Sequence, residues 1–376
     1  MSLIPTMTSR QRMAAVLRGE LPDRVPFHPS YYFDHACLVM GKRFEDFLID
    51  PLLGNPTMLQ AALRYRTDTV RMATVPDDDW FANKIVREED GQLVQLDRRT
   101  GKKEGIFDVA GGGKFQPFEP PAPVRTLNDV RNIPVMPAKE WVQRGHFCGV
   151  RESVEEAHRH GLFVVGFCTG QTLNFLVDKL GGPENALLAF YDEPELVHAL
   201  FEKAVEVSLE RAKGYVEAGV DLIYIGDSYA SGSVISPEVY ETFCAPAYRQ
   251  MAAQVRRMGV FTYKHCCGYY DPLLEYLPST GIDAMDGIDP TTGMSVRHTK
   301  AVIGNRVTLI GGLSCLTLLQ GTPDEVYAEA KACIDQGKPG GRYVLGSACA
   351  IPRLTPSENL DAARQAVEDH GWYTDR

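Results

Sequence analysis

The sequence predicts an α/β chain whose eight strands close into a (β/α)8 (TIM) barrel. From residue 160 onward, six short β-rich runs alternate with long helical patterns, and two more such runs lie upstream. A strand, helix, strand rhythm indicates parallel pairing of the strands. Eight such units in a chain of 376 residues favour a closed barrel over an open doubly wound sheet.

The expected strands are short runs rich in β-branched and aromatic residues. In chain order they are RVPFH (24–28), DTVRMA (68–73), LFVVGF (162–167), LIYIG (222–226), VFTYK (260–264), IDAMD (282–286), VTLIGG (307–312) and RYVLG (342–346).

The helices between these runs carry recognisable signals. An apolar stripe at helical spacing predicts a helix over 194–218, with Pro194 in its first turn. Capping boxes predict three further helix starts, at Thr8 with Gln11, Thr322 with Glu325, and Thr355 with Glu358.

Residues 74–145 do not follow the barrel rhythm. This stretch is polar, rich in Gly and Pro, and contains the turn signals EEDGQ and RRTGK. We therefore expect one barrel domain over 1–376 that carries a β-hairpin excursion at 74–145. The tip of this excursion is a candidate lid or contact in a homodimer, and a plain surface insertion is the alternative.

Composition narrows the classes of function. The net charge of −10 comes without a Lys or Arg block, so we expect no nucleic-acid surface. No apolar run approaches the length that spans a bilayer, and the start MSLIPTMTSRQR lacks a signal region, so we expect a cytoplasmic protein. Nine irregularly spaced cysteines favour free thiols or metal ligation over a disulfide framework.

The stretch YKHCCGYY (263–270) carries the first candidate metal ligands. Residues two apart in a strand point to the same face, so His265 and Cys267 should project together while Cys266 points away. An imidazole nitrogen and a thiolate on one side can meet a single ion. Two ligands alone make a poor site, and the alternative is that these are packed core residues.

A third ligand follows from the barrel. The stretch GSACAIP places Cys349 just beyond the eighth strand, at the carboxyl rim where barrel enzymes build their active sites. One histidine and two cysteines form a soft set that prefers zinc over magnesium or calcium. Three protein ligands leave one position open, which is typical of a catalytic rather than a structural zinc.

Longer stretches resemble a known family. TSRQRMAAVLRGELPDRVPF, GFCTGQTLNFLVDKLGG, AGVDLIYIGDSYAS, GGLSCLTLLQGTPDEVYAEAKACI and GSACAIPRLTPSENLDAA are similar to segments of the uroporphyrinogen decarboxylase superfamily. The resemblance covers nearly the whole chain and implies a (β/α)8 barrel. It also implies one of two chemistries, a metal-free porphyrinogen decarboxylase or a zinc methyltransferase that works with a corrinoid protein.

The motifs favour the methyltransferase branch. The arginine-containing MRQAGRY-like segment of true decarboxylases is replaced by FHPSYYFDHACLVMGKRF, whereas His265, Cys267, Gly268 and Cys349 match the His-x-Cys-Gly and late-Cys pattern of the methyltransferases. The resemblance thus implies zinc, a methyl-corrinoid carried by a partner protein, and a small-molecule thiol or folate as acceptor. A metal-independent decarboxylase, or a binding barrel with a structural zinc, are the alternatives.

Other candidate site residues lie at predicted strand ends. Asp227 and Asp286 could orient His265 or occupy the fourth zinc position, and a helix cap or turn is the alternative for Asp227. The candidates for lining the substrate pocket are His28, Tyr31, Tyr32 and Cys168, with aromatic packing or an inert buried thiol as the alternative.

Overall fold

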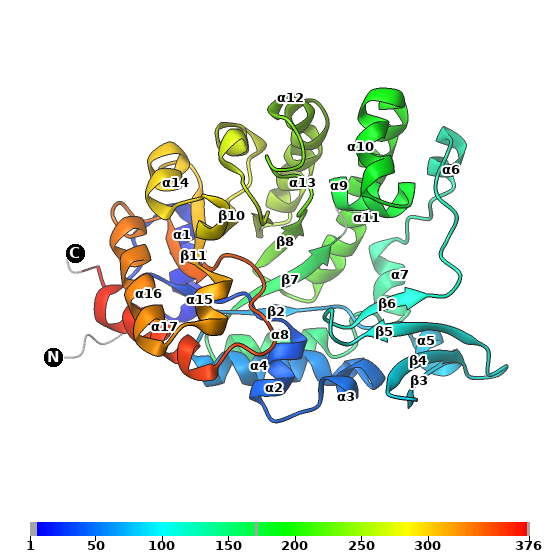
Figure 1. Cartoon of the computed structure of the whole chain (residues 1–376), viewed down its shortest axis with the longest axis horizontal. Coiled ribbons are helices and arrows are strands. Elements are labelled where there is room, and N and C mark those ends of the chain that lie inside the picture. The colour runs from blue at the N-terminus through cyan, green and yellow to red at the C-terminus, as the bar shows by residue number, and fades with distance from the viewer. Residues whose placement is uncertain (1–5, 170–171, 374–376) are drawn as a thin grey trace.

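Eight parallel strands form the centre of the molecule in a computed structural model, which describes residues 6–169 and 172–373 (Figure 1). Neighbouring strands pair in the order β1-β12-β11-β10-β9-β8-β7-β2. Their bounds are β1 (Phe27–His28), β2 (Thr69–Met72), β7 (Phe163–Thr169), β8 (Leu222–Gly226), β9 (Phe261–His265), β10 (Ala284–Ile288), β11 (Thr308–Leu313) and β12 (Tyr343–Ser347). The predicted (β/α)8 barrel is confirmed, and each of its eight strands overlaps a predicted run.

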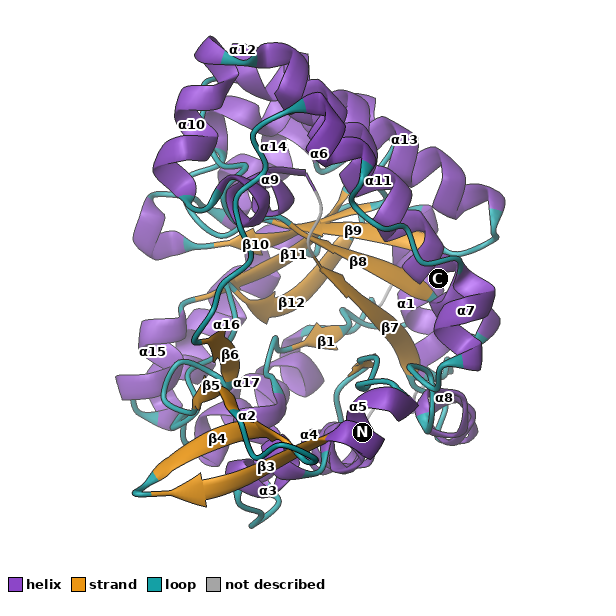
Figure 2. Ribbon diagram, turned by 90° about the vertical axis from the view of Figure 1, so that its right-hand side faces the viewer, coloured by secondary structure: helices purple, strands orange, loops and turns teal. Residues whose placement is uncertain are grey.

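Helices surround the strands (Figure 2). Those of eight residues or more are α1 (Ser9–Arg18), α4 (Gly54–Tyr65), α8 (Val150–Arg159), α9 (Thr172–Leu180), α10 (Pro183–Asp192), α11 (Pro194–Glu217), α13 (Ala245–Arg257), α14 (Val296–Ile303), α16 (Pro323–Gly337) and α17 (Ser357–His370). Shorter helices are α2 (Phe33–Val39), α3 (Phe44–Ile49), α5 (Asp78–Asn83), α6 (Leu127–Arg131), α7 (Ala138–Gln143), α12 (Pro237–Val239) and α15 (Cys315–Gln320). The remaining turns of 3-10 or π type are Pro51–Leu53, Tyr240–Cys244, Asp271–Thr280 and Pro290–Thr292. Within the described residues, no helix is both long and apolar enough to cross a bilayer.

Two of the three predicted capping boxes are present. Thr8 and Thr322 each accept a hydrogen bond from the third helical residue, whose side chain bonds back to the cap. The third prediction is wrong, because α17 begins at Ser357 with Pro356 as its cap. Thr355 therefore lies one residue before the cap, where its hydroxyl cannot reach the orphan amides of the helix.

The carboxylate of Asp68 helps to close the seam between β1 and β2. The backbone N–H of Asp68 donates to the carbonyl of Phe27, and the N–H of Phe27 donates back to the Asp68 side chain at 2.7 Å. The same carboxylate accepts hydrogen bonds from Arg12 (2.6 Å) and Arg24 (2.8 Å), all three side chains being buried. One side chain thus ties α1, β1 and β2 together.

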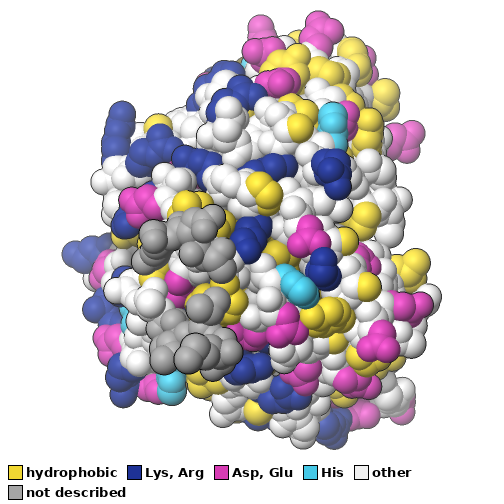
Figure 3. All heavy atoms as spheres, turned by 90° about the vertical axis from the view of Figure 1, so that its left-hand side faces the viewer, with side chains coloured by type: hydrophobic (Ala, Val, Ile, Leu, Met, Phe, Trp, Pro, Cys, Tyr) yellow, Lys and Arg dark blue, Asp and Glu magenta, His cyan; other side chains and the backbone are white. Residues whose placement is uncertain are grey.

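Helix α1 closes the amino end of the barrel. Its residues Met13, Val16 and Leu17 pack with inward-facing strand residues such as Leu222 and Tyr263. Figure 3 shows this end of the molecule, where Lys and Arg side chains form a band among scattered acidic groups. Because this end is plugged, a site inside the barrel can open only at the carboxyl end.

The excursion between β2 and β7 is larger than a single hairpin. Four antiparallel strands run in the order β3 (Lys84–Glu89), β4 (Gln92–Asp97), β5 (Lys103–Asp108) and β6 (Lys114–Pro117). The predicted turn at EEDGQ is present, with positive φ at Asp90 and Gly91 as a two-residue hairpin requires. This sheet packs on α2 and α3 through a small apolar cluster and lies toward the end where the barrel strands finish (Figure 1).

Candidate metal centre

The end of β9 presents His265 and Cys267 to the barrel mouth. His265 pairs in register with Gly226 of β8 and Asp286 of β10. Cys266 points the other way, as predicted from strand alternation, and its buried thiol donates to the carbonyl of Ala230 at 3.3 Å. Gly268 follows with φ of +107°, which ends the strand in a conformation that a side chain would strain.

The loop after β12 brings Cys349 to the same place. The nearest ligand atoms of His265, Cys267 and Cys349 all lie within 4.8 Å of one another. The Sγ of Cys349 is 3.8 Å from Nε2 of His265. Ligand atoms of a tetrahedral zinc are separated by roughly 3.3 to 3.8 Å, given bonds of about 2.0 Å to nitrogen and 2.3 Å to sulfur. The three side chains therefore fit one ion of this kind with small side-chain movements.

Asp286 fixes the orientation of His265. Its Oδ2 accepts a hydrogen bond from Nδ1 of the imidazole at 2.9 Å, which leaves Nε2 free to face the cysteines. Burial opposes ionisation of Asp286, but His265, His28 and Arg71 outweigh it and lower the pKa of the carboxyl. A histidine held by a carboxylate through one nitrogen is the usual arrangement at metal sites.

Proton sharing couples the three candidate ligands. The Cys349 thiol and the His265 imidazole both stabilise a thiolate at Cys267, so the pKa of Cys267 is lowered. The same contact with Cys267, together with burial, raises the pKa of Cys349. Burial lowers the pKa of His265, but Asp286 and Cys267 outweigh it and raise the pKa to about 9.

A buried arginine lies beneath the cluster and was not predicted. Arg71 of β2 donates to the hydroxyls of Ser30 and Tyr263, both at 2.9 Å, and lies 3.8 Å from Asp286. The rings of Tyr32 and Tyr224 flank its guanidinium at 5.1 and 5.5 Å. The only signal in the sequence was a charged residue inside the apolar run DTVRMA.

Comparison with known proteins places the chain in a family. A family model described as uroporphyrinogen decarboxylase (URO-D) matches residues 114–370. The chain belongs to the URO-D family.

Its relatives carry two kinds of activity in their names. The chain is 31% identical over 191 residues to a methylated-thiol–coenzyme M methyltransferase of Methanosarcina mazei (50% of this chain, 49% of the relative). It is 34% identical over 176 residues to a methylcobamide:CoM methyltransferase of Methanosarcina barkeri (46% and 49%). It is 29% identical over 259 residues to a uroporphyrinogen decarboxylase of Myxococcus xanthus (67% and 70%). The match thus spans about half the length of the methyltransferase relatives.

One solved structure shares the fold of this URO-D family member. A methyltransferase from Methanosarcina mazei superposes with a TM-score of 0.73 at 24% identity, covering 96% of this chain and 99% of that one. At this identity the likeness establishes the architecture alone.

Asp227 does not belong to the group of candidate metal ligands in this URO-D family barrel. Its buried carboxylate accepts hydrogen bonds from the backbone N–H groups of Leu173 and Asn174, at 3.1 and 2.9 Å, and from the hydroxyl of Tyr248 at 2.6 Å. Burial raises the pKa of Asp227 to about 6. Asp227 therefore caps α9, which is the alternative role stated for it above. The carboxylate that holds His265 is that of Asp286.

Of the four predicted pocket residues, two lie beside the candidate metal ligands and two do not. Tyr32 and His28 adjoin the cluster; His28 bonds to Thr69 inside the barrel, where burial lowers its pKa to about 3. Tyr31 does not adjoin it, because its ring packs on His35 and Tyr65 at 6.0 and 5.8 Å. Cys168 faces outward from β7 and donates to the carbonyl of Ser208 at 3.7 Å. The structure therefore does not bring Tyr31 or Cys168 to the centre, contrary to the expectation for these two.

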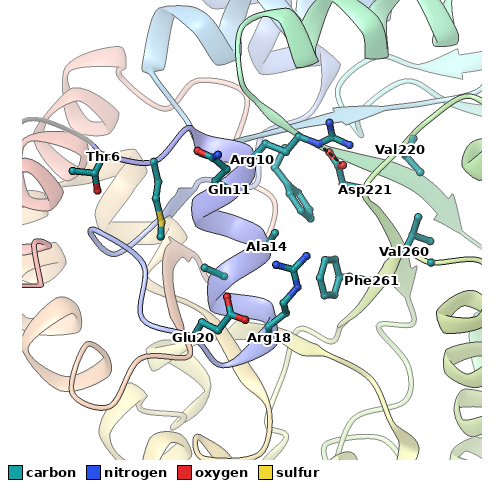
Figure 4. A pocket seen from close by; sticks show the side chains of 14 residues that line it. Thr6, Arg10, Gln11, Ala14, Arg18, Glu20, Val220, Asp221, Val260 and Phe261 are labelled. Atoms are coloured by element: carbon teal, nitrogen blue, oxygen red, sulfur yellow. Dashed lines mark hydrogen bonds and ion pairs between the residues drawn. The ribbon is translucent and has the colours of Figure 1, made fainter. Parts of the chain in front are cut away.

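A separate cavity lies at the opposite end of the barrel. It has a volume of about 730 Å³ and lies along α1, near the amino ends of β7 and β9 (Figure 4). Arg10 at its wall is paired with Asp221 at 2.8 Å, and Arg18 lies over the ring of Phe261 at 5.9 Å. Residues of α1 line this cavity, and none of the three candidate metal ligands does.

Proposed function

We propose that this chain is a zinc-dependent methyltransferase that moves a methyl group between a corrinoid on a partner protein and a small-molecule thiol. The observation that carries the proposal is the convergence of His265, Cys267 and Cys349 from two distant segments within 4.8 Å. The names of the relatives from Methanosarcina support the same chemistry.

The chain supplies three candidate ligands that would leave one position of a tetrahedral zinc open. A neutral imidazole and two thiolates balance the charge of a divalent zinc, and when bound, zinc lowers the pKa of an incoming thiol and holds its sulfur in place. Asp286 keeps the proton of His265 on Nδ1, so that Nε2 remains the donor atom. Cys267 is already poised as a thiolate by its neighbours.

The transfer itself is a displacement at the methyl carbon. An electron pair of the acceptor sulfur forms the new sulfur–carbon bond, and the pair of the broken cobalt–carbon bond remains on cobalt, which is reduced formally from Co(III) to Co(I). The proton of the thiol leaves to solvent. The partner's corrinoid thus supplies the cobalt chemistry, while this chain positions and activates the thiol.

Partner and compartment follow from this chemistry. The methyl-corrinoid must be presented at the carboxyl end of the barrel, because α1 fills the other end. All nine cysteines are free thiols, which suits a reducing compartment, and we infer a cytoplasmic location. A folate acceptor is the alternative to the thiol, and it would need a different role for the metal.

Metal content and methyl transfer test the proposal together. Protein purified without chelators should contain about one zinc per chain, and zinc-edge absorption should gain a sulfur neighbour when a thiol is added. Free methylcobalamin can stand in for the partner's corrinoid, and its demethylation can be followed by absorbance in the presence of a thiol. A metal-free protein that decarboxylates a porphyrinogen would overturn the proposal, and a zinc closed by four protein groups would indicate a structural site.

Replacing Asp286 with Asn should weaken zinc binding. The amide keeps the shape of the side chain but no longer holds His265 as a charged acceptor, so we expect zinc affinity to fall by about 10- to 100-fold. Competition with a chromophoric chelator measures this. Asp227→Asn is the matched control, because that buried carboxylate on the neighbouring strand does not contact the imidazole. A larger loss in Asp227→Asn than in Asp286→Asn would contradict the assignment.

Zinc binding should release protons. At pH 7 the metal-free site holds one proton on Cys349, whose pKa is raised, and an extra one on His265, whose pKa is about 9. Both must leave before the metal binds, so we expect about two protons per zinc, and an apparent affinity that rises with pH until His265 is neutral. Calorimetry in buffers of different ionisation enthalpy counts these protons. Release of fewer than one proton would show that the ligands are already ionised.

A further inference from the structure

Two buried polar atoms beside the metal cluster have no hydrogen-bond partner in the part of the chain that the structure describes. They are Nη1 of Arg71 and Oδ1 of Asp286. The side chain of Arg71 is 6% exposed and that of Asp286 is fully buried, and the two approach to 3.8 Å through their other atoms. An unpaired buried polar atom costs about 1 to 3 kcal/mol, and more when it is charged, so a bound group that paired with both atoms would be stabilised at this place.

The other polar atoms of these two side chains are already paired. Arg71 uses Nε and Nη2 on Tyr263 and Ser30, and Asp286 uses Oδ2 on His265. What remains is one cationic donor next to one anionic acceptor. A simple anion would satisfy Arg71 and lie unfavourably beside a carboxylate, whereas a simple amine would satisfy Asp286 and lie beside a guanidinium. A water or hydroxyl could bridge the two atoms, but only a group that carries both charges gives each of them a counter-charge.

The position of Tyr32 connects this pair to the metal cluster. Tyr32 lies in the segment between β1 and α2, is half-buried, and places its ring over the guanidinium of Arg71 at 5.1 Å. Burial raises the pKa of Tyr32, and the nearby Cys349 adds to this shift, so the phenol also lies near the sulfur ligand. A ligand that displaces this ring would extend from the cysteines toward Arg71 and Asp286.

We propose that the acceptor thiol carries an α-amino acid head group, whose carboxylate pairs with Arg71 and whose ammonium pairs with Asp286. This rests on the proposed methyl transfer and names the class of its acceptor: a short thiol amino acid of the homocysteine type, methylated on sulfur to a thioether. The metal held by the three candidate ligands would bind the sulfur, and Arg71 and Asp286 would bind the head group at the opposite end of the molecule.

Binding of the thioether product tests head-group recognition without the metal. In metal-free protein, calorimetry should show that methionine binds at least about tenfold more tightly than 3-(methylthio)propionate, which lacks the ammonium, and 3-(methylthio)propylamine, which lacks the carboxylate. Equal binding of the three, no binding of any, or tightest binding of the acid alone would overturn the inference. The last result would indicate an anion site that suits 2-mercaptoethanesulfonate.

Substitutions assign the two ends of the head group. In Arg71→Met, methionine and the amine analogue should bind alike; in the isosteric Asp286→Asn, methionine and the acid analogue should bind alike. Lys264→Met is the matched control, because this buried cation on β9 faces outward between the rings of Tyr248 and Tyr270. Lys264→Met should bind the three compounds in the same order of affinity as the unsubstituted protein. Loss of the preference for methionine in this variant would count against Arg71 and Asp286 as the residues that recognise the head group.

Recognition of the amino acid head group and the proposed methyl transfer can be rejected independently of each other. Methyl transfer to 2-mercaptoethanesulfonate as fast as to homocysteine would reject the amino acid head group and leave the methyltransferase intact. A methionine preference in a protein that neither holds zinc nor demethylates methylcobalamin would reject the methyltransferase and leave the recognition pair.

Discussion

Replacing Cys349 with Ser should abolish tight zinc binding and, with it, methyl transfer. The substitution removes one of the three proposed protein ligands, and zinc sites in small peptides gain roughly 10 to 16 kcal/mol from four. A loss of about 3 kcal/mol for one ligand corresponds to about 10²-fold or more in affinity. Zinc per chain after dialysis against a mild chelator measures the first effect, and demethylation of methylcobalamin measures the second.

Cys266→Ser provides the matched control for this substitution. Cys266 lies next to the cluster in sequence, but its thiol faces the opposite side of the strand and bonds to Ala230, a contact that a serine hydroxyl can make. We expect one zinc per chain to be retained. If Cys266→Ser loses zinc and Cys349→Ser keeps it, the ligand set is wrong.

Replacing Asp68 with Asn should lower the free energy of unfolding more than any other substitution proposed above. The neutral amide leaves Arg24 buried without its counter-charge and leaves Arg12 with Asp23 alone, and breaking a buried charge pair in this way costs about 3 to 5 kcal/mol. Burial opposes ionisation of Asp68, but Arg24 and Arg12 outweigh it and lower the pKa of the carboxyl. Its contribution is therefore present above the unfolded-state pKa, near 4, and is lost as the pH falls through the lower folded-state value.

Urea unfolding at pH 7 and at lower pH measures both effects. The unfolding free energy should fall in Asp68→Asn at pH 7, and the difference from the unsubstituted protein should shrink as the pH decreases toward 2. Asp361→Asn is the control, because its pair with Arg64 is nearly half exposed and should contribute within about 1 kcal/mol. Similar losses in the two variants would show that Asp68 does not close the barrel seam.

The barrel could be predicted from sequence because its strands are short apolar runs separated by periodic helices. Even the two-residue β1 was found, within RVPFH. The excursion was harder: its turn signals indicated hairpins, but the packing of four strands on α2 and α3 depends on contacts between segments that the pattern does not connect. Thr355 was wrongly predicted as a helix cap because a threonine three residues before a glutamate is typical of a capping box. The cap position is taken by Pro356 instead, so the helix begins one residue later than predicted.

The site was partly predictable for the same reason. His265 and Cys267 follow from alternation along one strand, and Cys349 from the rule that parallel strands end on one rim. The network beneath them could not be predicted, since Arg71, Tyr263 and Asp286 lie on three different strands and meet only through the stagger of the closed barrel. Asp227 and Asp286 looked alike in the sequence, and only the helix that follows β7 distinguishes them.

The pairing of β1 with β12 also has a consequence for how the protein is made. Phe27 of β1 lies opposite Leu345 of β12, so β1 meets this neighbour only after the residues between them have been synthesised. At about 5 to 20 residues per second, this delay amounts to roughly 15 to 60 s. During that interval β1 and Arg24 can already pair with Asp68, but the other edge of β1 has no strand to pair with. We therefore expect the pairing of β1 with β12 to be the last part of the barrel to form.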